Sequence, residues 1–422
     1  MPMPADTDAV GAEGALGHLR ICDFTGQLAG AGATRWLAAF GAEVIRIEDP
    51  VRRGRWDILR GSPPFKDERR GIEAGTGFNN HNVNKLGITL NLRTERGREL
   101  LAELVRVSDV VAENFAAGVL ERLGFSYDHL VELRPDVVYV SNCGFGQTGP
   151  YREYKSWGPI AQAVGGLTHT SGLPDQPPAG WGYSYMDHTG AYYMAIAILM
   201  AVHHRQRTGQ GQWVDLSCTE AAATLHGAPL LDWSVNGRPL RRAGAPNSNR
   251  NQAPPMAPHG IYPCEGEDNW VAIACRHDGD WLALADVIDT DWARQPHLAT
   301  LQGRLAAEDE LDDHMCGWTA SHNRWAVVDD VVAAGVPAAA VARPGERIDG
   351  DATTHAWGLW PMVDHPYTGG ARVDGLPVHL SATDWSITSA APLLGQHNRQ
   401  VYGELLGLGD AEIDALAGEG VI

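Results

Sequence analysis

The 422-residue sequence contains few cysteines, no long apolar run and no excess of basic residues. Lys and Arg together number 33 against 52 Asp and Glu, so the net charge is −19. A surface with that charge repels phosphate backbones and anionic lipids, so we expect neither general nucleic-acid binding nor membrane binding. The longest apolar run, residues 191–202, is too short to span a bilayer. One anionic ligand in a local basic pocket remains compatible with this charge.

The six cysteines form no C-x-x-C pair, and their spacing fits no structural zinc site. Several of them lie in apolar, strand-like segments, which is typical of reduced thiols in a cytoplasmic protein. The first 17 residues carry neither a basic cluster nor an apolar core, so we expect no signal peptide. The histidines show no metal-ligand spacing, and neither a G-x-S-x-G elbow nor a Walker loop is present. We therefore expect no metal, and the sequence excludes the common serine hydrolase and P-loop folds.

Strands and helices alternate along the first half of the chain. A strand at 19–24 is followed by a loop of small residues, a helix at 34–40 and a second strand at 43–47. The same rhythm continues in further segments, namely strands at 87–92, 109–113, 137–141 and 213–217 and a helix at 94–108. This alternation predicts an α/β fold with a Rossmann-like parallel sheet covered by helices on both faces.

The composition shifts to Pro, Asn, Arg and Gly over 235–260, which indicates a linker into a second domain. The length of the chain also favours more than one domain. We predict that residues 1–225 form the first part of a large domain and that 226–340 form a smaller inserted α/β domain with its linkers. Residues 341–422 would then return to the large domain.

The loop after the first strand contains Gly26, Gly30 and Gly32. Their spacing is G-x-x-x-G-x-G, whereas dinucleotide binding needs G-x-G-x-x-G, so an NAD site is not favoured. The glycines would instead allow a helix to pack tightly on the sheet, or expose backbone N–H groups to some other nucleotide. The residues alone leave both interpretations open.

Asp187 stands shortly before Gly190 and the apolar run, where a long helix should begin. The common interpretation is a helix N-cap. The same position suits an ionised nucleophile, because a helix N-terminus would hold the pKa of the carboxyl down and Gly190 would leave room for a substrate. A carboxylate of this kind can form covalent acyl intermediates. Sequence physics does not choose between these two roles.

From Leu19 to the C-terminus, the chain resembles the class III CoA-transferases, the family of formyl-CoA transferase and carnitine CoA-transferase. The resemblance is carried by an ordered set of motifs that includes LRICDFTGQLAGAGATRWLAAFGAEVIRIE, MDHTGAYYMAIAILMAVHHRQRTGQGQWVDLS and APLLGQHN. It implies a homodimer of two interlocked rings, with an acyl-CoA donor and a carboxylic acid acceptor as substrates and coenzyme A as the group transferred. It also implies that Asp187 is the nucleophile that forms an aspartyl anhydride and then an aspartyl-CoA thioester.

The family's CoA-contacting positions can be carried over one by one. They correspond here to Gln27, Leu28, Ala29, Arg53, Lys85, Asn114, Phe115, Arg122 and Lys155. Lys and Arg would meet the phosphate charges, whereas Asn, Phe and backbone groups would hold the adenine, ribose and pantetheine.

The sequence departs from the formyl enzyme at several of its positions. Leu28 replaces a polar side chain, and Asp49 stands where a phosphate-binding arginine is expected. Arg53, or else Arg52 or Arg55, would take over the role of that arginine. No glycine-run loop is evident, and Trp56 would shape a different acyl pocket. We therefore do not expect formyl or oxalyl specificity.

Two alternative functions stay open. The α-methylacyl-CoA racemases of the same superfamily use a His and Asp pair as bases, but Trp157 occupies the position of that His. A non-catalytic CoA-binding subunit of a hetero-oligomer is the other alternative, and the presence of Asp187 argues against it.

Overall fold

The computed structural model describes residues 14–173, 176–182, 184–243, 245 and 247–422. The chain divides into two compact units. The larger unit takes the described parts of Met1–Thr168, Gly180–Leu230 and Thr353–Ile422, and the smaller unit takes those of His169–Ala179 and Leu231–Ala352. The large unit is therefore assembled from segments that lie far apart in the sequence.

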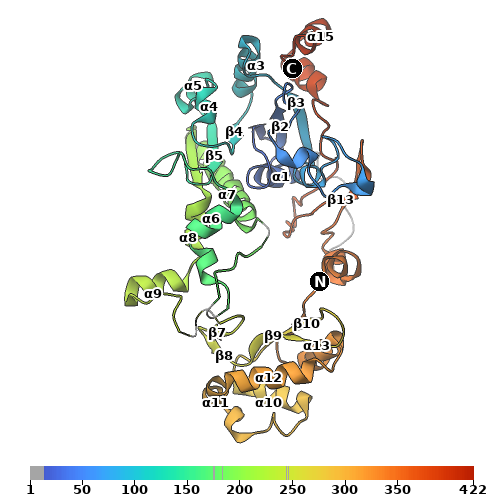
Figure 1. Cartoon of the computed structure of the whole chain (residues 1–422). Coiled ribbons are helices and arrows are strands. Elements are labelled where there is room, and N and C mark those ends of the chain that lie inside the picture. The colour runs from blue at the N-terminus through green and yellow to red at the C-terminus, as the bar shows by residue number, and fades with distance from the viewer. Residues whose placement is uncertain (1–13, 174–175, 183, 244, 246) are drawn as a thin grey trace. The chain divides into compact units, whose positions relative to one another are not determined.

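A six-stranded parallel sheet forms the centre of the large unit (Figure 1). Its strands follow the order β3-β2-β1-β4-β5-β6. They are β1 (Arg20–Asp23), β2 (Glu43–Glu48), β3 (Lys85–Thr89), β4 (Val110–Glu113), β5 (Val138–Cys143) and β6 (Gln212–Ser217). The order changes direction between β1 and β4. In parallel α/β sheets the crevice beyond the carboxyl ends of two such strands is the usual ligand site.

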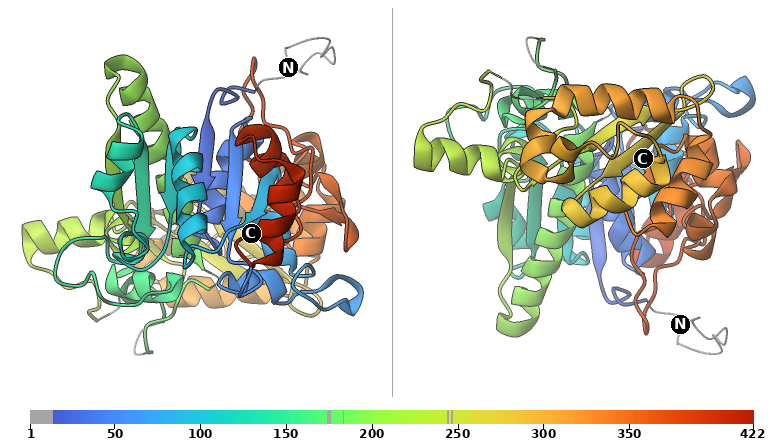
Figure 2. Two further views of the ribbon diagram at one scale, coloured as in Figure 1. Left: turned by 90° about the horizontal axis from the view of Figure 1, so that it is seen from above. Right: turned by 90° about the horizontal axis from the view of Figure 1, so that it is seen from below.

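Helices cover both faces of this sheet, because successive strand residues are apolar on both sides. On one face, Ile45 and Val111 pack against α3 (Glu95–Arg106), α5 (Tyr127–Leu133) and α15 (Asp410–Gly418). The C-terminal α15 is the red helix that lies beside the strands in Figure 2. On the other face, Val44 and Val110 pack against α1 (Ala31–Ala39) and α7 (Tyr185–Thr208). The predicted parallel α/β architecture is confirmed.

Shorter elements complete the two units. In the large unit they are α2 (Thr76–His81), α4 (Val119–Arg122), α6 (Gly158–Val164), α8 (Cys218–Thr224), β12 (Met362–His365) and β13 (Gly369–Arg372). Two helices, α9 (Ala228–Asn236) and α14 (Ala352–Ala356), contain the residues at which the chain passes from one unit to the other. The smaller unit has an antiparallel sheet of β9 (His259–Pro263), β10 (Trp270–Ala274) and β11 (Ala338–Ala340), and a short pair, β7 (Asn251–Gln252) and β8 (Pro255–Met256). Its helices are α10 (Asp278–Ile288), α11 (Leu301–Ala306), α12 (Glu308–Thr319) and α13 (Arg324–Ala333).

The smaller unit has a core of its own, in which Trp281, Leu284 and Met315 are buried. Across the described ranges of the chain, no helix is both long enough and apolar enough to cross a membrane.

Candidate active site

A cavity of about 310 Å³ lies in the large unit at the carboxyl edge of the sheet, next to the point where the strand order changes direction. It is bounded by the segments that follow β1, β4 and β5 and by the starts of α6, α7 and α8. Its lining residues are Gln27, Ala29, Asn114, Phe115, Ala116, Ala117, Asn142, Cys143, Gly144, Arg152, Tyr154, Lys155, Ser156, Trp157, Gly158, Ala161, Asp187 and Cys218.

The turn after β1 is joined to the loop after β4 by a pair of hydrogen bonds. The backbone N–H of Gly26 donates to Oδ1 of Asn114 at 2.7 Å, and Nδ2 of Asn114 donates to the Gly26 carbonyl at 3.0 Å. Gly30 makes room for this amide, since a Cβ built on it would lie 2.6 Å from Cγ of Asn114. Gly30 is therefore required for the close approach of the first turn to the loop after β4.

Asp187 is the third residue of α7, whose N-cap is Ser184. The N-cap interpretation of Asp187 is therefore wrong. The side chain lines the cavity, and its carboxylate accepts hydrogen bonds from the Ser184 hydroxyl and from the backbone N–H of Gly158. Two donors from different segments thus fix the carboxylate at the wall of the cavity.

Burial raises the pKa of Asp187, and its effect outweighs the two hydrogen bonds and the nearby His188. The expectation that the helix N-terminus would hold this pKa down is wrong. The dipole acts on a group at the helix end, but removal of water from the carboxylate is the larger effect here. A poorly solvated carboxylate attacks a carbonyl carbon more readily than a hydrated one, because it has less water to shed.

Gly190 is buried and does not line the cavity. A Cβ on Gly190 would lie 2.7 Å from Sγ of Cys218, so this glycine allows α7 to pack against α8. The expectation that Gly190 leaves space for a substrate is wrong. The neighbouring Asn142, at the end of β5, donates from Nδ2 to the Ala29 carbonyl at 3.1 Å and thus ties the first loop to this wall of the cavity.

The structure brings six of the ten site residues named from the sequence to one cavity. They are Asp187, Gln27, Ala29, Asn114, Phe115 and Lys155. The other four do not line it. Leu28 is buried, Arg53 is exposed, and Arg122 is exposed and donates from Nη1 to the carbonyl of Ala117 at 3.3 Å.

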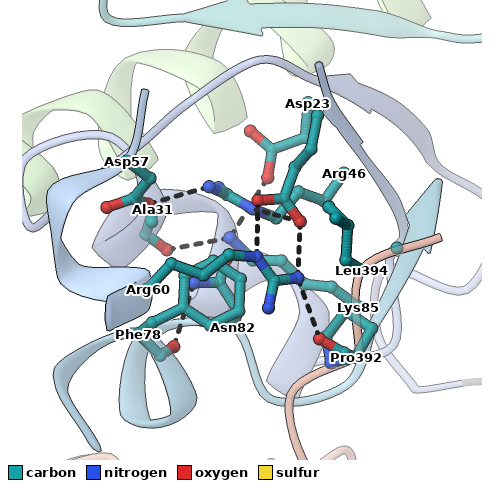
Figure 3. A network of polar contacts seen from close by, with 12 residues as sticks. Asp23, Ala31, Arg46, Asp57, Arg60, Phe78, Asn82, Lys85, Pro392 and Leu394 are labelled. Carbon is teal, nitrogen blue, oxygen red and sulfur yellow. Dashed lines mark hydrogen bonds and ion pairs between the residues drawn. The ribbon is translucent and has the colours of Figure 1, made fainter. Parts of the chain in front are cut away.

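Lys85 is fully buried in a polar network on the sheet (Figure 3). Its Nζ donates to Oδ2 of Asp23 at 3.1 Å, to Oγ1 of Thr34 at 2.7 Å and to the Ala31 carbonyl at 3.1 Å. An ammonium group has three hydrogens, so these three acceptors use all of them. Lys85 thus has no N–H group left for a ligand in this arrangement.

Arg152 and Tyr154 line the cavity but were not named from the sequence. The signal that could have found them is the run YREYKSW, in which basic and aromatic residues follow the Gly149-Pro150 turn closely. The partner of Arg152 is the adjacent Glu153, whose Oε1 lies 3.0 Å from Nε. Both side chains are largely exposed, so this pair contributes little and leaves the guanidinium available to a ligand.

A second pocket of about 290 Å³ shares Phe115 with the first. Its wall includes Trp56, Arg52 and Arg93, and the ring of Trp56 lies 5.3 Å from that of Phe115. Trp56 does not line the Asp187 cavity, so the expectation that it shapes the acyl pocket is wrong. Phe115 thus lines both the Asp187 cavity and this aromatic pocket. Within the part of the chain that the structure describes, no cluster of three or more His, Cys, Asp and Glu is placed to hold a metal ion.

The family profile described as CoA-transferase family III matches residues 16–398, so the chain belongs to this family. The formyl-CoA:oxalate CoA-transferase of Streptomyces avermitilis is 34% identical over 97% of this chain and 99% of its own length. The succinyl-CoA–D-citramalate CoA-transferase of Chloroflexus aurantiacus is 33% identical over 96% of this chain and 98% of its own. The succinyl-CoA:mesaconate CoA-transferase of Haloarcula marismortui is 33% identical over 93% of this chain and 96% of its own length.

The fold is similar to that of solved structures. The crystal structure of a CAIB/BAIF family protein from Brucella suis superposes with a TM-score of 0.82 at 28% identity, covering 93% of this chain and all of that one. The chain is thus a class III CoA-transferase by family, and enzymes of this kind act on CoA thioesters and carboxylates.

Proposed function

We propose that the protein transfers coenzyme A from an acyl-CoA donor to a carboxylic acid, with Asp187 as the nucleophile. The observation that carries this proposal is the half-buried Asp187 carboxylate in a cavity that also contains five of the predicted CoA contacts. Gln27, Asn114 and Phe115 would hold the pantetheine arm. The nucleotide end would lie in the second pocket, where Trp56 offers a ring for the adenine and where Arg52 and Arg93 stand beside the carboxylates of Glu48 and Asp49. Arg52 thus replaces Arg53 as the arginine proposed to meet a phosphate.

The proposed reaction exchanges one acyl bond for another in four steps. The Asp187 carboxylate attacks the thioester carbonyl and expels CoA thiolate, which leaves a mixed anhydride. The thiolate then attacks the aspartyl carbonyl of the anhydride, releasing the donor acid and forming an aspartyl-CoA thioester. The acceptor carboxylate attacks this thioester and expels the thiolate again. The thiolate finally attacks the acceptor's acyl carbon, giving the new acyl-CoA and free Asp187.

We further propose that the acceptor carries a second carboxylate. Among the lining residues, the cavity has two cations, Arg152 and Lys155, and a single carboxylate, Asp187. Lys155 is expected to contact CoA, which leaves Arg152 for the acid, and a guanidinium binds a carboxylate through two parallel hydrogen bonds. Oxalate, citramalate and mesaconate, the acids named for the three relatives, each have two carboxylates.

The homodimer expected from the resemblance is also a proposal. Helix α7 exposes Tyr193, Ile196, Leu199 and Met200 in the isolated chain. A helix that is apolar on most sides is usually buried, so a second copy of the chain is the proposed cover. Ile196→Lys combined with Met200→Lys should give monomer or aggregate in sedimentation, whereas the wild-type chain should sediment as a dimer. A monomeric wild type would exclude this assembly.

The covalent mechanism is tested by trapping Asp187. Hydroxylamine added during turnover should convert the acylated side chain to a hydroxamate, which peptide mass spectrometry would locate. Asp187→Ala should lose transfer and retain CoA binding. An unmodified Asp187 peptide under turnover conditions would contradict the mechanism.

Two further results would favour the alternative functions. Deuterium exchange at the α-carbon without an acceptor acid would indicate the racemase, and CoA binding without transfer would indicate the non-catalytic subunit.

A further inference from the structure

A cluster of fully buried charged side chains lies beneath the turn that follows β1 (Figure 3). Nη2 of Arg46 lies 2.8 Å from Oδ2 of Asp57, and Nζ of Lys85 lies 3.1 Å from Oδ2 of Asp23. A buried ion pair is costly to desolvate and is weak evidence of added stability. The backbone groups held by these charges are therefore more informative about their role.

The cluster binds the backbone of Thr25 and of Gln27. Nη1 of Arg46 donates to the Thr25 carbonyl, and Oδ1 of Asp23 accepts the Thr25 N–H at 2.9 Å. Oδ2 of Asp57 accepts the Gln27 N–H at 3.0 Å and a hydrogen of Arg46 at 2.8 Å. Gln27 has a φ of 53°, a left-handed conformation that is unfavourable for a residue other than glycine. Such a conformation persists only where the surroundings determine it.

We propose that the Arg46–Asp57 pair positions Gln27 at the transfer site. Neither member of the pair lines the cavity, whereas Gln27 does. The pair acts by holding the Gln27 peptide in the left-handed conformation, which presents the side chain to the cavity that contains Asp187. This inference rests on the proposed function, because Gln27 is there a contact of coenzyme A.

The position of Asp57 requires a carboxylate. Its Oδ2 accepts from both Gln27 and Arg46, and its Oδ1 accepts the Leu59 N–H at 3.0 Å. An asparagine offers one acceptor oxygen and one NH₂ donor. In either orientation of the amide, its NH₂ group would face an N–H donor. Asp57→Asn therefore keeps the size of the side chain but loses either the hydrogen bond from Leu59 or those from Gln27 and Arg46.

The test is a double-mutant cycle read by calorimetric binding of coenzyme A to the full chain. Asp57→Asn should weaken CoA binding about tenfold. Gln27→Gly should weaken it by a similar factor, because glycine has no side chain to position. The double variant should bind no more weakly than Gln27→Gly alone, since residues that act through one another are not additive. If the two losses multiply instead, the proposal is overturned.

A matched control comes from the opposite edge of the same sheet. Asp109, just before β4, accepts hydrogen bonds from Arg134 at 2.7 Å, from Arg205 at 3.0 Å and from the Arg20 backbone at 2.8 Å. Asp109→Asn should lower the melting temperature and leave CoA affinity within twofold of wild type. A tenfold loss of affinity in this control would show a merely structural effect and overturn the proposal.

A second variant keeps the cycle readable if Asp57→Asn does not fold. Arg46→Lys retains the charge but has no fork to reach both Asp57 and the Thr25 carbonyl, so it should show the same coupling to Gln27→Gly. Additive losses with Arg46→Lys would also overturn the proposal. A wild type that binds CoA but transfers it to no acid would overturn the proposed function, while the binding cycle would still report on Gln27.

Discussion

Gly158 faces Asp187 so closely that a Cβ built on it would lie 2.3 Å from Oδ2 of the carboxylate. The N–H of the same glycine donates to that carboxylate. The first residue of α6 therefore sets the position of the proposed nucleophile through both its missing side chain and its backbone.

Gly158→Ala should move the Asp187 carboxylate away from its present position. A displacement of about 1 Å can cost about 100-fold in rate, so we expect a loss of that order in kcat with much smaller change in CoA affinity. Steady-state transfer and calorimetric CoA binding measure the two quantities. Gly317→Ala is the control, because a Cβ there meets nothing within 4 Å. An active Gly158→Ala variant would mean that the carboxylate position is not critical.

Asp187→Asn should remove transfer and change the dependence of stability on pH. Because burial raises the pKa of Asp187, the folded state favours the neutral form. The stability from this preference is complete below the ordinary pKa of 3.8 and is lost as the pH rises through the raised value. A neutral amide avoids that loss, so its melting temperature relative to that of wild type should be higher at pH 7 than at pH 3. An equal difference between the two proteins at both pH values would contradict the assigned burial effect.

Glu113 should give the protein a pH-dependent stability near neutrality. Its Oε2 accepts the Phe115 N–H at 2.6 Å, and burial raises the pKa of Glu113 to about 7. The contribution of this group is complete below about pH 4.5 and is lost as the pH rises through about 7. Glu113→Gln should therefore gain stability relative to wild type as the pH rises from about 4.5 to about 7, as measured by thermal melts. Parallel melting curves across this range would rule out Glu113 as the titrating group.

Arg152→Gln should separate acids with one carboxylate from acids with two. A hydrogen-bonded charge contact is worth about 1.5–3 kcal/mol, so kcat/KM for succinate should fall about 10- to 100-fold with acetyl-CoA as donor. The kcat/KM for butyrate, which has the same chain length, should change less than about threefold, because butyrate has no second carboxylate for Arg152 to bind. Equal losses for the two acids would place Arg152 against CoA instead. Lys155→Gln provides the comparison. It should lower kcat/KM equally for the two acids, because Lys155 is expected to contact CoA and not the acid.

The strands and helices of the large unit could be predicted because the alternation of apolar and polar residues depends on residues that are close together in the sequence. The β1–α1–β2 unit and the amphipathic α3 lie within a few residues of their predicted ranges. Strand β3 lies at 85–89 rather than at 87–92, because Asn84, with a φ of 60°, turns the chain just before it. The chain then pairs with β2 from Lys85 onward.

The partners of the buried charged residues could not be predicted in the same way. Arg46 appeared as an ordinary alternating residue of a strand, and its partner Asp57 lies eleven positions later in a loop. Lys85 was expected to meet a phosphate, but the same ammonium group satisfies Asp23 inside the protein. The residue types at the site were predictable from the family motifs, whereas their burial and their pKa values depend on contacts between distant segments.

The composite origin of the large unit affects how it can be synthesised. Val401, Ile413 and Leu416 cover the face of the sheet that contains Ile45 and Val111. Translation reaches them only after β6 and the whole smaller unit, roughly 10–40 s later at about 5–20 residues per second. During that interval one face of the sheet is without its final cover in the nascent chain. A chaperone that binds exposed apolar surface would act in this window, and truncation before Val401 would leave the sheet open to aggregation.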